Sequence, residues 1–336
     1  MKIFAILGCG MIAAFHAEAI AGIDGAVLKG VADIKFENAE RFARERNIIA
    51  YESYDKLLAD KEIDAVCICT PNGFHAEGAI KALDAKKHVV LEKPMAITAE
   101  SADDIIEACR RNESCLTVIS QLRLSEDIQK AKKLLDEGKL GRILSADLYM
   151  KYWREPSYYQ HSSWKGTYAI DGGGALMNQG IHGVDILQYL VGTPTVVSAI
   201  SKTLVHSIEA EDIIAATVEF ESGAIGVIQA STCLKPGFER KIEIIGTDGY
   251  MIIVEDKIEE LVLDGKKIEN ASESNTAKSN SAADPSAFST ELHKRQIHNF
   301  INAVDKKEKL IIDEVEGKKA VKIICDIYNK AKKEIH

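Results

Sequence analysis

Lys93 is the first side chain in this sequence whose setting suggests chemistry. It follows a short apolar run at 89–91 and the acid Glu92, and it precedes Pro94. A proline ring clashes with helical backbone at the preceding residue, so the chain itself aims the lysine amine. A cation at the end of a buried strand lies where open α/β sheets bind their ligands. We therefore expect Lys93 to stabilise negative charge that develops on a substrate oxygen.

A second polar group lies on a predicted helix that begins after three glycines, Gly172–Gly174. Asn178 and His182 are four residues apart, and hence on one helix face, and Asp185 lies three residues further on. A lone histidine on such a helix is commonly a hydrogen-bonded core residue. Because the glycines permit close backbone approach and Lys93 offers a second catalytic group, we predict that His182 accepts a proton near neutral pH.

The chain opens with a strand and a glycine-rich turn. Gly8, Gly10 and Ala13 form the pattern GxGxxA at the start of a helix whose first residues include Met11 and Ile12. In a dinucleotide-binding turn the first glycine permits the sharp bend, the second lets the backbone approach the pyrophosphate, and the small third residue keeps helix and strand close. The helix N-terminus then faces the phosphates. The alternative is a glycine turn without a ligand.

An acid follows the second predicted strand, 26–32. Asp33 comes twenty residues after Ala13, the spacing expected of a carboxylate that accepts hydrogen bonds from the adenosine ribose. Strand, helix, second strand and acid in this order predict a bound dinucleotide. A carboxylate repels the 2′-phosphate of NADP, so NAD is favoured as the cofactor, although Lys35 nearby leaves NADP open.

Strands and helices continue to alternate up to about residue 120. This order is typical of right-handed βαβ crossovers, and it predicts a first domain, 1–120, with a doubly wound parallel sheet. Residues that follow the predicted strands complete the predicted cofactor site: Thr70, Pro71, Asn72, His75, Glu92 and Lys93. Asn72 equally fits a turn-stabilising role, His75 the first turn of a helix, and Glu92 the partner of a neighbouring cation.

The remainder, 121–336, has a different pattern of predicted strands and helices. Strand-like segments between about residues 196 and 263, joined by hairpin turns, indicate a largely antiparallel sheet of about six or seven strands, counting one at 142–153. Helices, one of them at 175–190, should cover one face, and the other face is a candidate surface for self-association. The predicted class is α/β: a Rossmann domain and then an α+β substrate-binding domain, whose C-terminal helix can pack back on the first.

Aromatic residues concentrate between Tyr149 and Tyr168, a stretch with both tryptophans and five of the ten tyrosines. Aromatic faces with polar tips suit ring-shaped hydroxylated ligands, and nearby cations suit acidic groups. The alternative is a loop packed on its own aromatics or a subunit interface. The substrate-binding residues predicted here are Lys151, Trp153, Trp164 and Lys165, with Arg154 as a further cation.

The composition is that of a globular protein with two cores. The chain has 336 residues, 46% of them hydrophobic, with no signal-peptide pattern and no apolar run near the roughly 20 residues of a membrane helix. A net charge of −9 argues against a nucleic-acid partner, since phosphate binding needs clustered cations. Seven cysteines without zinc spacing indicate reduced thiols and no metal site. We expect a cytoplasmic protein that does not bind membranes.

Four motifs, in this order, resemble the Gfo/Idh/MocA oxidoreductases, the glucose-fructose oxidoreductase and inositol dehydrogenase family. They are the 8–13 turn, Thr70-Pro71-Asn72 with His75, Glu92-Lys93-Pro94, and the run from Gly172 through Asn178 and His182 to Asp185. The resemblance covers essentially the whole chain. It implies an open C-terminal sheet, commonly used for homodimers or homotetramers, and Lys93 with His182 as the catalytic pair. Gln121 and Arg123 fall where the family often has substrate-facing polar residues, and we predict that Gln121 contacts the cofactor and Arg123 the substrate.

Two positions depart from the family's pattern, and the first is Leu124, where the family usually has an aromatic residue. The residue four before the catalytic histidine is usually aspartate in inositol dehydrogenase-like members, and here it is Asn178, which cannot accept a proton. Asparagine at this position, together with the run 163–166, is similar to members that act on nucleotide-linked uronic acids.

The residues and the resemblance together predict NAD-dependent oxidation of a secondary alcohol on a sugar, sugar acid or cyclitol. Lys93 would stabilise the alkoxide, His182 would accept the proton and Asn178 would orient the substrate. The alternative among enzymes is a 3-dehydrogenase of nucleotide-linked uronic acids, in which cations pair with phosphates or a carboxylate. A binding protein that senses NAD or a sugar without catalysis is the alternative from another class.

Overall fold

The computed structural model describes residues 1–272 and 290–333. These residues form two compact units, of which the first comprises 1–121 and 290–318 and the second 122–272 and 319–333. The first unit therefore takes in a segment close to the chain's end that the sequence assigns to the second domain.

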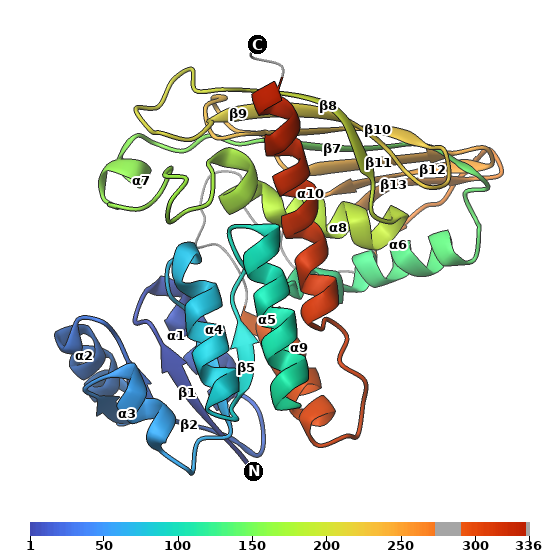
Figure 1. Ribbon diagram of the computed structural model, residues 1–336. Helices are drawn as coiled ribbons and strands as arrows, with labels where there is room; N and C mark the ends of the chain where they lie inside the picture. The colour runs from blue at the N-terminus through green and yellow to red at the C-terminus, as the bar shows by residue number, and fades with distance from the viewer. Residues whose placement is uncertain (273–289, 334–336) are drawn as a thin grey trace. The chain divides into compact units, whose positions relative to one another are not determined.

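The first unit holds a six-stranded parallel sheet, as the alternating pattern predicts (Figure 1). Its order is β3-β2-β1-β4-β5-β6, so the direction of winding reverses between β1 and β4. The loops that leave the carboxyl ends of these two strands form the switch point where doubly wound sheets bind ligands. The strands are β1 (Lys2–Leu7), β2 (Ala26–Ala32), β3 (Ile49–Tyr51), β4 (Ala65–Ile68), β5 (His88–Leu91) and β6 (Leu116–Val118).

Helices pack on this sheet because each of them buries an apolar stripe. They are α1 (Met11–Ala21), α2 (Phe36–Arg46), α3 (Tyr54–Ala59), α4 (His75–Asp84), α5 (Ala99–Asn112) and α9 (Thr290–Val304), with a short 3₁₀ turn, η1 (Asn72–Phe74), before α4. Helix α1 packs against α9, and α4 against α5. Ile20 of α1 and Phe300 of α9 are buried in one cluster with Phe4 and Ile6 of β1. Helix α9 thus completes the first core although it comes late in the sequence.

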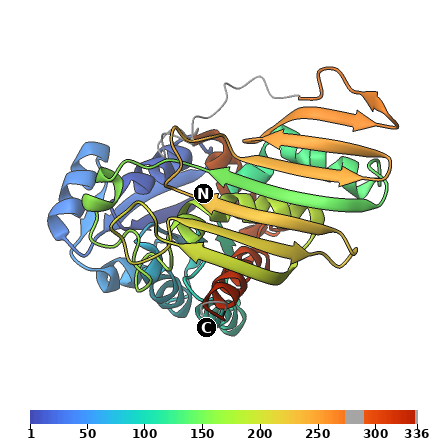
Figure 2. The same ribbon diagram turned by 90° about the horizontal axis from the view of Figure 1, so that it is seen from above.

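The second unit is built on an eight-stranded sheet, slightly larger than predicted, whose strands lie side by side in Figure 2. Neighbouring strands are antiparallel except β7 and β10, which are parallel. The order is β14-β13-β12-β11-β7-β10-β9-β8. The strands are β7 (Ile143–Lys151), β8 (Thr195–Lys202), β9 (Ile213–Glu219), β10 (Ile225–Ser231), β11 (Lys241–Gly246), β12 (Gly249–Val254), β13 (Lys257–Leu263) and β14 (Lys266–Lys267).

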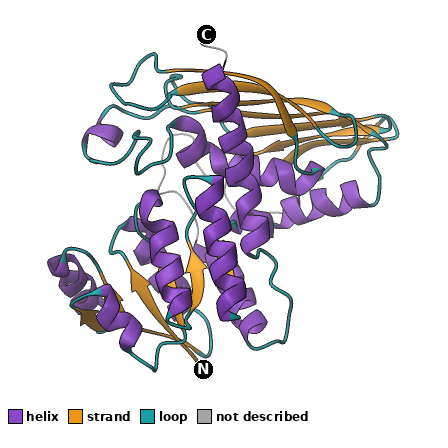
Figure 3. Cartoon of the chain, in the orientation of Figure 1, coloured by secondary structure: helices purple, strands orange, loops and turns teal. Residues whose placement is uncertain are grey.

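One face of this second sheet is packed against helices, which Figure 3 shows in purple beside the orange strands. Gly183 lets α8 approach β7 closely, since a Cβ atom there would lie 2.6 Å from the sulfur of Met150. Leu148 and Met150 of β7 are buried at this contact. The helical segments of the second unit are α6 (Glu126–Asp136), α7 (Ser157–Gln160), η3 (Ala175–Gly180) and α8 (Ile181–Val191). The 3₁₀ turn η2 (Gln121–Leu124) and the last helix, α10 (Glu314–Lys333), carry residues of both units.

The segment that carries Asn178 and His182 differs from the predicted helix. Residues Ala175–Gly180 form a π-helix, and α8 begins only at Ile181. Hydrogen bonds in a π-helix join residues five apart, so successive side chains turn by a smaller angle than in an α-helix. The prediction of one continuous α-helix from 175 to 190 is therefore wrong, and spacing alone does not place Asn178 and His182 on one face.

Candidate active site

Gly8 makes the turn after β1 and has a φ of +96°, a backbone conformation that other residues rarely adopt. A Cβ atom on Gly8 would lie 2.6 Å from the carbonyl oxygen of Cys69. The N–H of Gly8 donates to the carbonyl of Ala32 at 2.8 Å, which fastens the turn to the end of β2. Glycine at this position is thus required by the fold itself.

Gly10 faces open space, in contrast to Gly8. A Cβ atom on Gly10 would meet no described atom within 4 Å. Gly10 is also the N-cap of α1, where no side chain accepts a hydrogen bond from the first N–H groups. Met11 is exposed, Ile12 is half-buried and Ala13 is buried against the sheet. A free helix N-terminus beside open space fits a pyrophosphate, because its N–H groups and its dipole both favour an anion.

Asp33 lies directly after β2, beside the same turn. One carboxylate oxygen accepts a hydrogen bond from the N–H of Cys9 at 2.8 Å, and the other accepts from the N–H of Lys35 at 2.9 Å. These two bonds hold the carboxylate at the end of the strand in a fixed orientation. An acid in this position matches a ligand for ribose hydroxyls, whose O–H groups would donate to the remaining lone pairs.

Two buried polar atoms at strand ends have no hydrogen-bond partner among the described residues. They are the Thr70 hydroxyl oxygen, after β4, and the Gln121 side-chain oxygen, after β6. A buried acceptor without a partner costs free energy, so such atoms indicate a bound group that donates to them. Together with the space at Gly10, they fit a dinucleotide along the carboxyl ends of the strands. Pro71 and Asn72 continue this edge, and Asn72 is buried at the start of η1.

The turn after β5 carries Lys93, which is half-buried, and a cis peptide joins it to Pro94. The N–H of Lys93 donates to one oxygen of the Glu92 carboxylate at 3.1 Å. His75 lies buried nearby, with one ring nitrogen 2.6 Å from the Pro94 carbonyl oxygen and the other 2.9 Å from that of Thr70. His75 therefore links the turn after β4 to the turn after β5. It is also the first residue of α4, which fits the alternative of a structural residue in the first turn of a helix.

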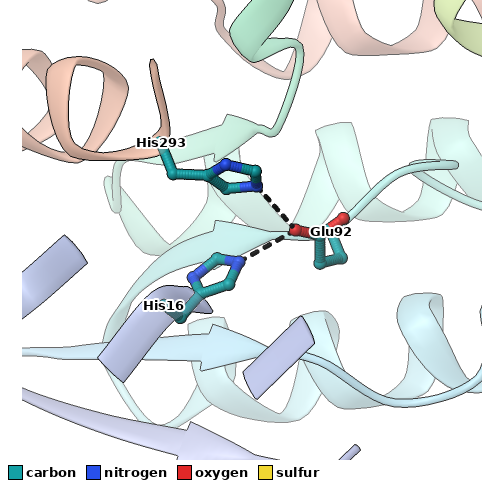
Figure 4. Close-up of side chains that lie close together, drawn as sticks. All are labelled: His16, Glu92 and His293. Atoms are coloured by element: carbon teal, nitrogen blue, oxygen red, sulfur yellow. Dashed lines mark hydrogen bonds and ion pairs between the residues drawn. The ribbon is translucent and has the colours of Figure 1, made fainter. Parts of the chain in front are cut away.

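The second oxygen of Glu92 faces two histidines (Figure 4). His16 Nε2 lies 2.9 Å from Glu92 Oε1, and His293 Nε2 lies 3.6 Å from the same oxygen. All three side chains are buried. Burial alone raises the pKa of the Glu92 carboxyl, but the hydrogen bond of His16 and the electrostatic effect of both imidazoles outweigh it and hold the pKa well below its usual range. Glu92 is thus the partner of buried histidines within its own unit, and its predicted contact with the cofactor stays a prediction.

In the second unit, a buried carboxylate holds the backbone ahead of Asn178. Glu211 accepts hydrogen bonds from the N–H groups of Gly174 and Leu176, both at 2.9 Å, and from the hydroxyl of Tyr328 at 2.9 Å. A Cβ atom on Gly174 would lie 1.8 Å from the Glu211 carbonyl oxygen, so the glycine is needed for this approach. Burial raises the pKa of Glu211 to about 7, against the opposing effect of these donors. Sequence reasoning missed Glu211, because its partners are far away along the chain.

Asn178 itself lies next to a carboxylate that sequence reasoning also missed. Its side-chain amide donates to Asp171 at 2.6 Å, and Asp171 accepts from the N–H of Gly166 as well, at 2.8 Å. Gln179 donates to the Asn178 side-chain oxygen at 3.1 Å and accepts from Arg154 at 2.8 Å. Asp171 is therefore a buried acid hydrogen-bonded to Asn178, the position at which the resemblance leads us to expect aspartate. Its place directly before the three glycines was the available signal.

His182 is half-buried in the first turn of α8. One turn later, Asp185 forms a paired contact with Arg123, with distances of 2.9 Å from Nε and 2.6 Å from a terminal guanidinium nitrogen. Arg123 is only 1% exposed, and its guanidinium is bound by Asp185 of the same unit. We therefore do not include Arg123 among the residues that we propose to meet the substrate.

The aromatic segment contributes cations that lie over aromatic rings. Lys165 Nζ is 3.6 Å from the centre of the Tyr158 ring, and Lys151 Nζ is 5.1 Å from that of Tyr149. Trp153 donates its indole N–H to Glu155 at 2.7 Å, and Trp164 is half-buried. These contacts are those of a loop packed partly on its own aromatics, the alternative that the sequence left open.

None of the helices described in the structure has the length and apolarity needed to cross a membrane.

The glycine turn, the fixed acid and the unpaired acceptors at the strand ends define a dinucleotide-binding protein with a second, sheet-based unit. The chain matches the family model described as "Oxidoreductase family, NAD-binding Rossmann fold" over residues 2–120 and the GFO/IDH/MocA C-terminal domain over residues 128–252. It therefore belongs to the GFO/IDH/MocA family and is an NAD-binding oxidoreductase.

Individual relatives are similar over most of their length. The chain is 32% identical over 255 residues to 2,7-anhydro-N-acetylneuraminate hydratase of Escherichia coli (strain K12), covering 74% of this chain and 67% of the relative. It is 28% identical to myo-inositol 2-dehydrogenase of Thermotoga maritima, covering 73% and 72%. The structure of the WlbA dehydrogenase from Bordetella pertussis, in complex with NADH and UDP-GlcNAcA, superposes with a TM-score of 0.89 at 29% identity, covering 99% and 96%.

Paired glycine variants test the cofactor turn. Gly10→Ala should leave thermal unfolding nearly unchanged, since its Cβ meets open space, but should weaken NADH binding by about tenfold or more, because the methyl group would occupy the space expected for the pyrophosphate. Gly8→Ala should lower the free energy of unfolding by about 1–3 kcal/mol through its positive φ and its clash with Cys69. NADH fluorescence titration and thermal melts measure both variants. Unchanged NADH affinity in a folded Gly10→Ala protein would place the pyrophosphate elsewhere.

Proposed function

We propose that this enzyme oxidises a secondary alcohol of a sugar, sugar acid or cyclitol reversibly, with the hydride passing to NAD. The observation that carries the proposal is the turn after β5, where hydrogen bonds hold a lysine within the NAD-binding unit itself. A fixed cation near a dinucleotide suits an alcohol substrate, because its oxygen gains negative charge as the hydride leaves.

Each residue then has a separate chemical role. Bound NAD supplies the acceptor for the hydride. Lys93 donates a hydrogen bond to the reacting oxygen and stabilises the alkoxide, whereas His182 accepts the hydroxyl proton. Asn178 orients the substrate through its amide, whose direction the bond to Asp171 fixes. The names of the relatives support a sugar-like substrate, since they include an inositol dehydrogenase and a dehydrogenase complexed with a nucleotide sugar.

A nucleotide-linked uronic acid is the more specific candidate. It is favoured by Asn178 and by the similarity to the WlbA dehydrogenase, which was solved with UDP-GlcNAcA. Lys151 and Lys165 are half-buried cations of this segment, whereas Arg154 is 2% exposed and donates to Gln179. An anionic substrate should bind more weakly as salt is raised, so the salt dependence of KM separates it from a neutral sugar.

Variants of the two proposed catalytic residues test the reaction. With NAD and a panel of polyols, sugars, sugar acids and nucleotide-linked uronic acids, the native enzyme should produce NADH from at least one member. Lys93→Ala and His182→Ala should each lower kcat by about 100- to 10,000-fold, because each removes a group that acts in the transition state. His161→Ala is the control, since His161 is an exposed histidine that has no proposed role.

Near-native turnover in either Lys93→Ala or His182→Ala would remove that residue from the mechanism. NADH binding without turnover of any panel member would favour the alternative of a non-catalytic protein that senses NAD or a sugar.

We also propose that the enzyme is a homodimer or homotetramer that associates through the second sheet. Ile200, Ile225 and Ile245 are 58%, 66% and 44% exposed. Ile225 and Ile245 both pair with Ser145 of β7, so they lie on the same face of the sheet. Ile200 pairs with Ala215 of β9 and Ile225 with Glu219, four residues apart on one strand, so Ile200 lies on that face as well. An exposed apolar patch on a sheet is typical of an association surface, and a second copy of the same face would cover it symmetrically.

A charge in this patch tests the association. Ile225→Asp should shift the protein toward the monomer in analytical ultracentrifugation, because dimer formation would bury the carboxylate. Ile311→Asp is the matched control, since Ile311 is 46% exposed and lies outside the sheet. An unchanged sedimentation profile for Ile225→Asp would show that this face is not the interface.

A further inference from the structure

We infer that Glu92 is a positioning residue for Lys93, and that His16 and His293 keep its carboxylate in place. The three residues form the His–Glu–His cluster, which lies wholly within the first unit. This inference deepens the proposed function and rests on it, because it assumes that Lys93 acts on the substrate.

The cluster joins three separate elements of the first unit. His16 lies on α1, Glu92 directly after β5, and His293 on α9. The side chains are 0%, 4% and 2% exposed, and both imidazoles point their Nε2 atoms at the same Glu92 oxygen (Figure 4). The three side chains stay together because a buried carboxylate that lost its partners would be left as an uncompensated charge.

The charge of Glu92 links the cluster to Lys93. An isolated carboxylate this deeply buried would take up a proton, whereas the two imidazoles favour its ionised form. An ionised carboxylate accepts stronger hydrogen bonds than a neutral one. The Lys93 N–H donates to the oxygen that the histidines leave available. Glu92 therefore fixes the backbone of the lysine from one side, while the His75 contact to the Pro94 carbonyl holds the other side.

The cluster also ties this turn to the cofactor helix. His16 is on the same helix, α1, whose N-terminus at Gly10 forms the phosphate-binding end. A shift of Glu92 would thus move the lysine relative to the helix that holds NAD. Catalysis depends steeply on such distances, since a displacement of about 1 Å can cost on the order of 100-fold in rate.

A metal ion is the competing explanation, because the three ligand atoms lie within 4.8 Å of one another. The distance of 2.9 Å between His16 Nε2 and Glu92 Oε1 is that of a direct hydrogen bond. Structural zinc normally has four ligands, and the part of the chain that is described groups only three here. Metal analysis of the purified protein decides between the two.

Glu92→Gln is the central variant, since it keeps the shape of the side chain and removes the charge. We expect kcat to fall about 100-fold, with the KM for NAD and the Kd for NADH changed less than about threefold. His16→Leu should lower kcat similarly, whereas His16→Gln, which retains an N–H donor toward Glu92, should recover much of the loss. His88→Gln is the control: it changes a half-buried histidine at the other end of β5, and kcat should stay near the native value.

A double-mutant cycle with Lys93→Met separates this inference from the proposed function. If Glu92 acts through Lys93, then Glu92→Gln should cost less than about threefold in kcat in the Lys93→Met background. A loss as large as in the native background would overturn the inference. Full turnover in Lys93→Met alone would instead refute the proposed role of Lys93, and with it the basis of the cluster's function.

Two further results would contradict the positioning role. A Glu92→Gln enzyme with native kcat and a lowered melting temperature would show that the cluster serves stability alone. A stoichiometric metal in the native protein that is lost from Glu92→Gln would show that the cluster is a metal site.

Discussion

The buried carboxylate of Glu92 is the constraint on which the first unit's functional edge depends. A charge in this position is stable only because His16 and His293 surround one oxygen and a backbone N–H occupies the other. The same requirement fixes the relative places of α1, the end of β5 and α9. The lysine turn and helix α1, whose N-terminus we propose binds the pyrophosphate, are therefore parts of one hydrogen-bonded assembly.

The second unit uses a comparable device. There Glu211 accepts hydrogen bonds from two backbone N–H groups at the start of the π-helix and from the hydroxyl of Tyr328. The carboxylate thus organises the segment that leads to Asn178 and His182, and Asp171 then orients the Asn178 amide. In both units a buried acid accepts hydrogen bonds from backbone N–H groups at or shortly before the residue proposed to meet the substrate.

Local patterns made much of this architecture predictable. The parallel sheet, the glycine turn and the acid after β2 follow from short-range spacing and strand–helix alternation, and the structure confirms the fold class. The partners of Glu92 and Arg123 were not predictable, because His293 and Asp185 come from distant segments and one sequence does not reveal long-range pairing. The π-helix was not predicted, because spacing of apolar residues does not show which carbonyl each N–H group bonds. A sequence also does not show which cations are already paired within the protein, so cationic residues could be proposed as substrate ligands but not distinguished from structural ones.

A crystal structure of the enzyme with NADH bound tests the central claim most directly. The account predicts that Glu92 Oε1 stays within about 3 Å of His16 Nε2, that the Lys93 N–H still donates to the second oxygen, and that the nicotinamide lies against the Lys93 turn. A Glu92 side chain that leaves the histidines and binds the cofactor ribose would contradict it.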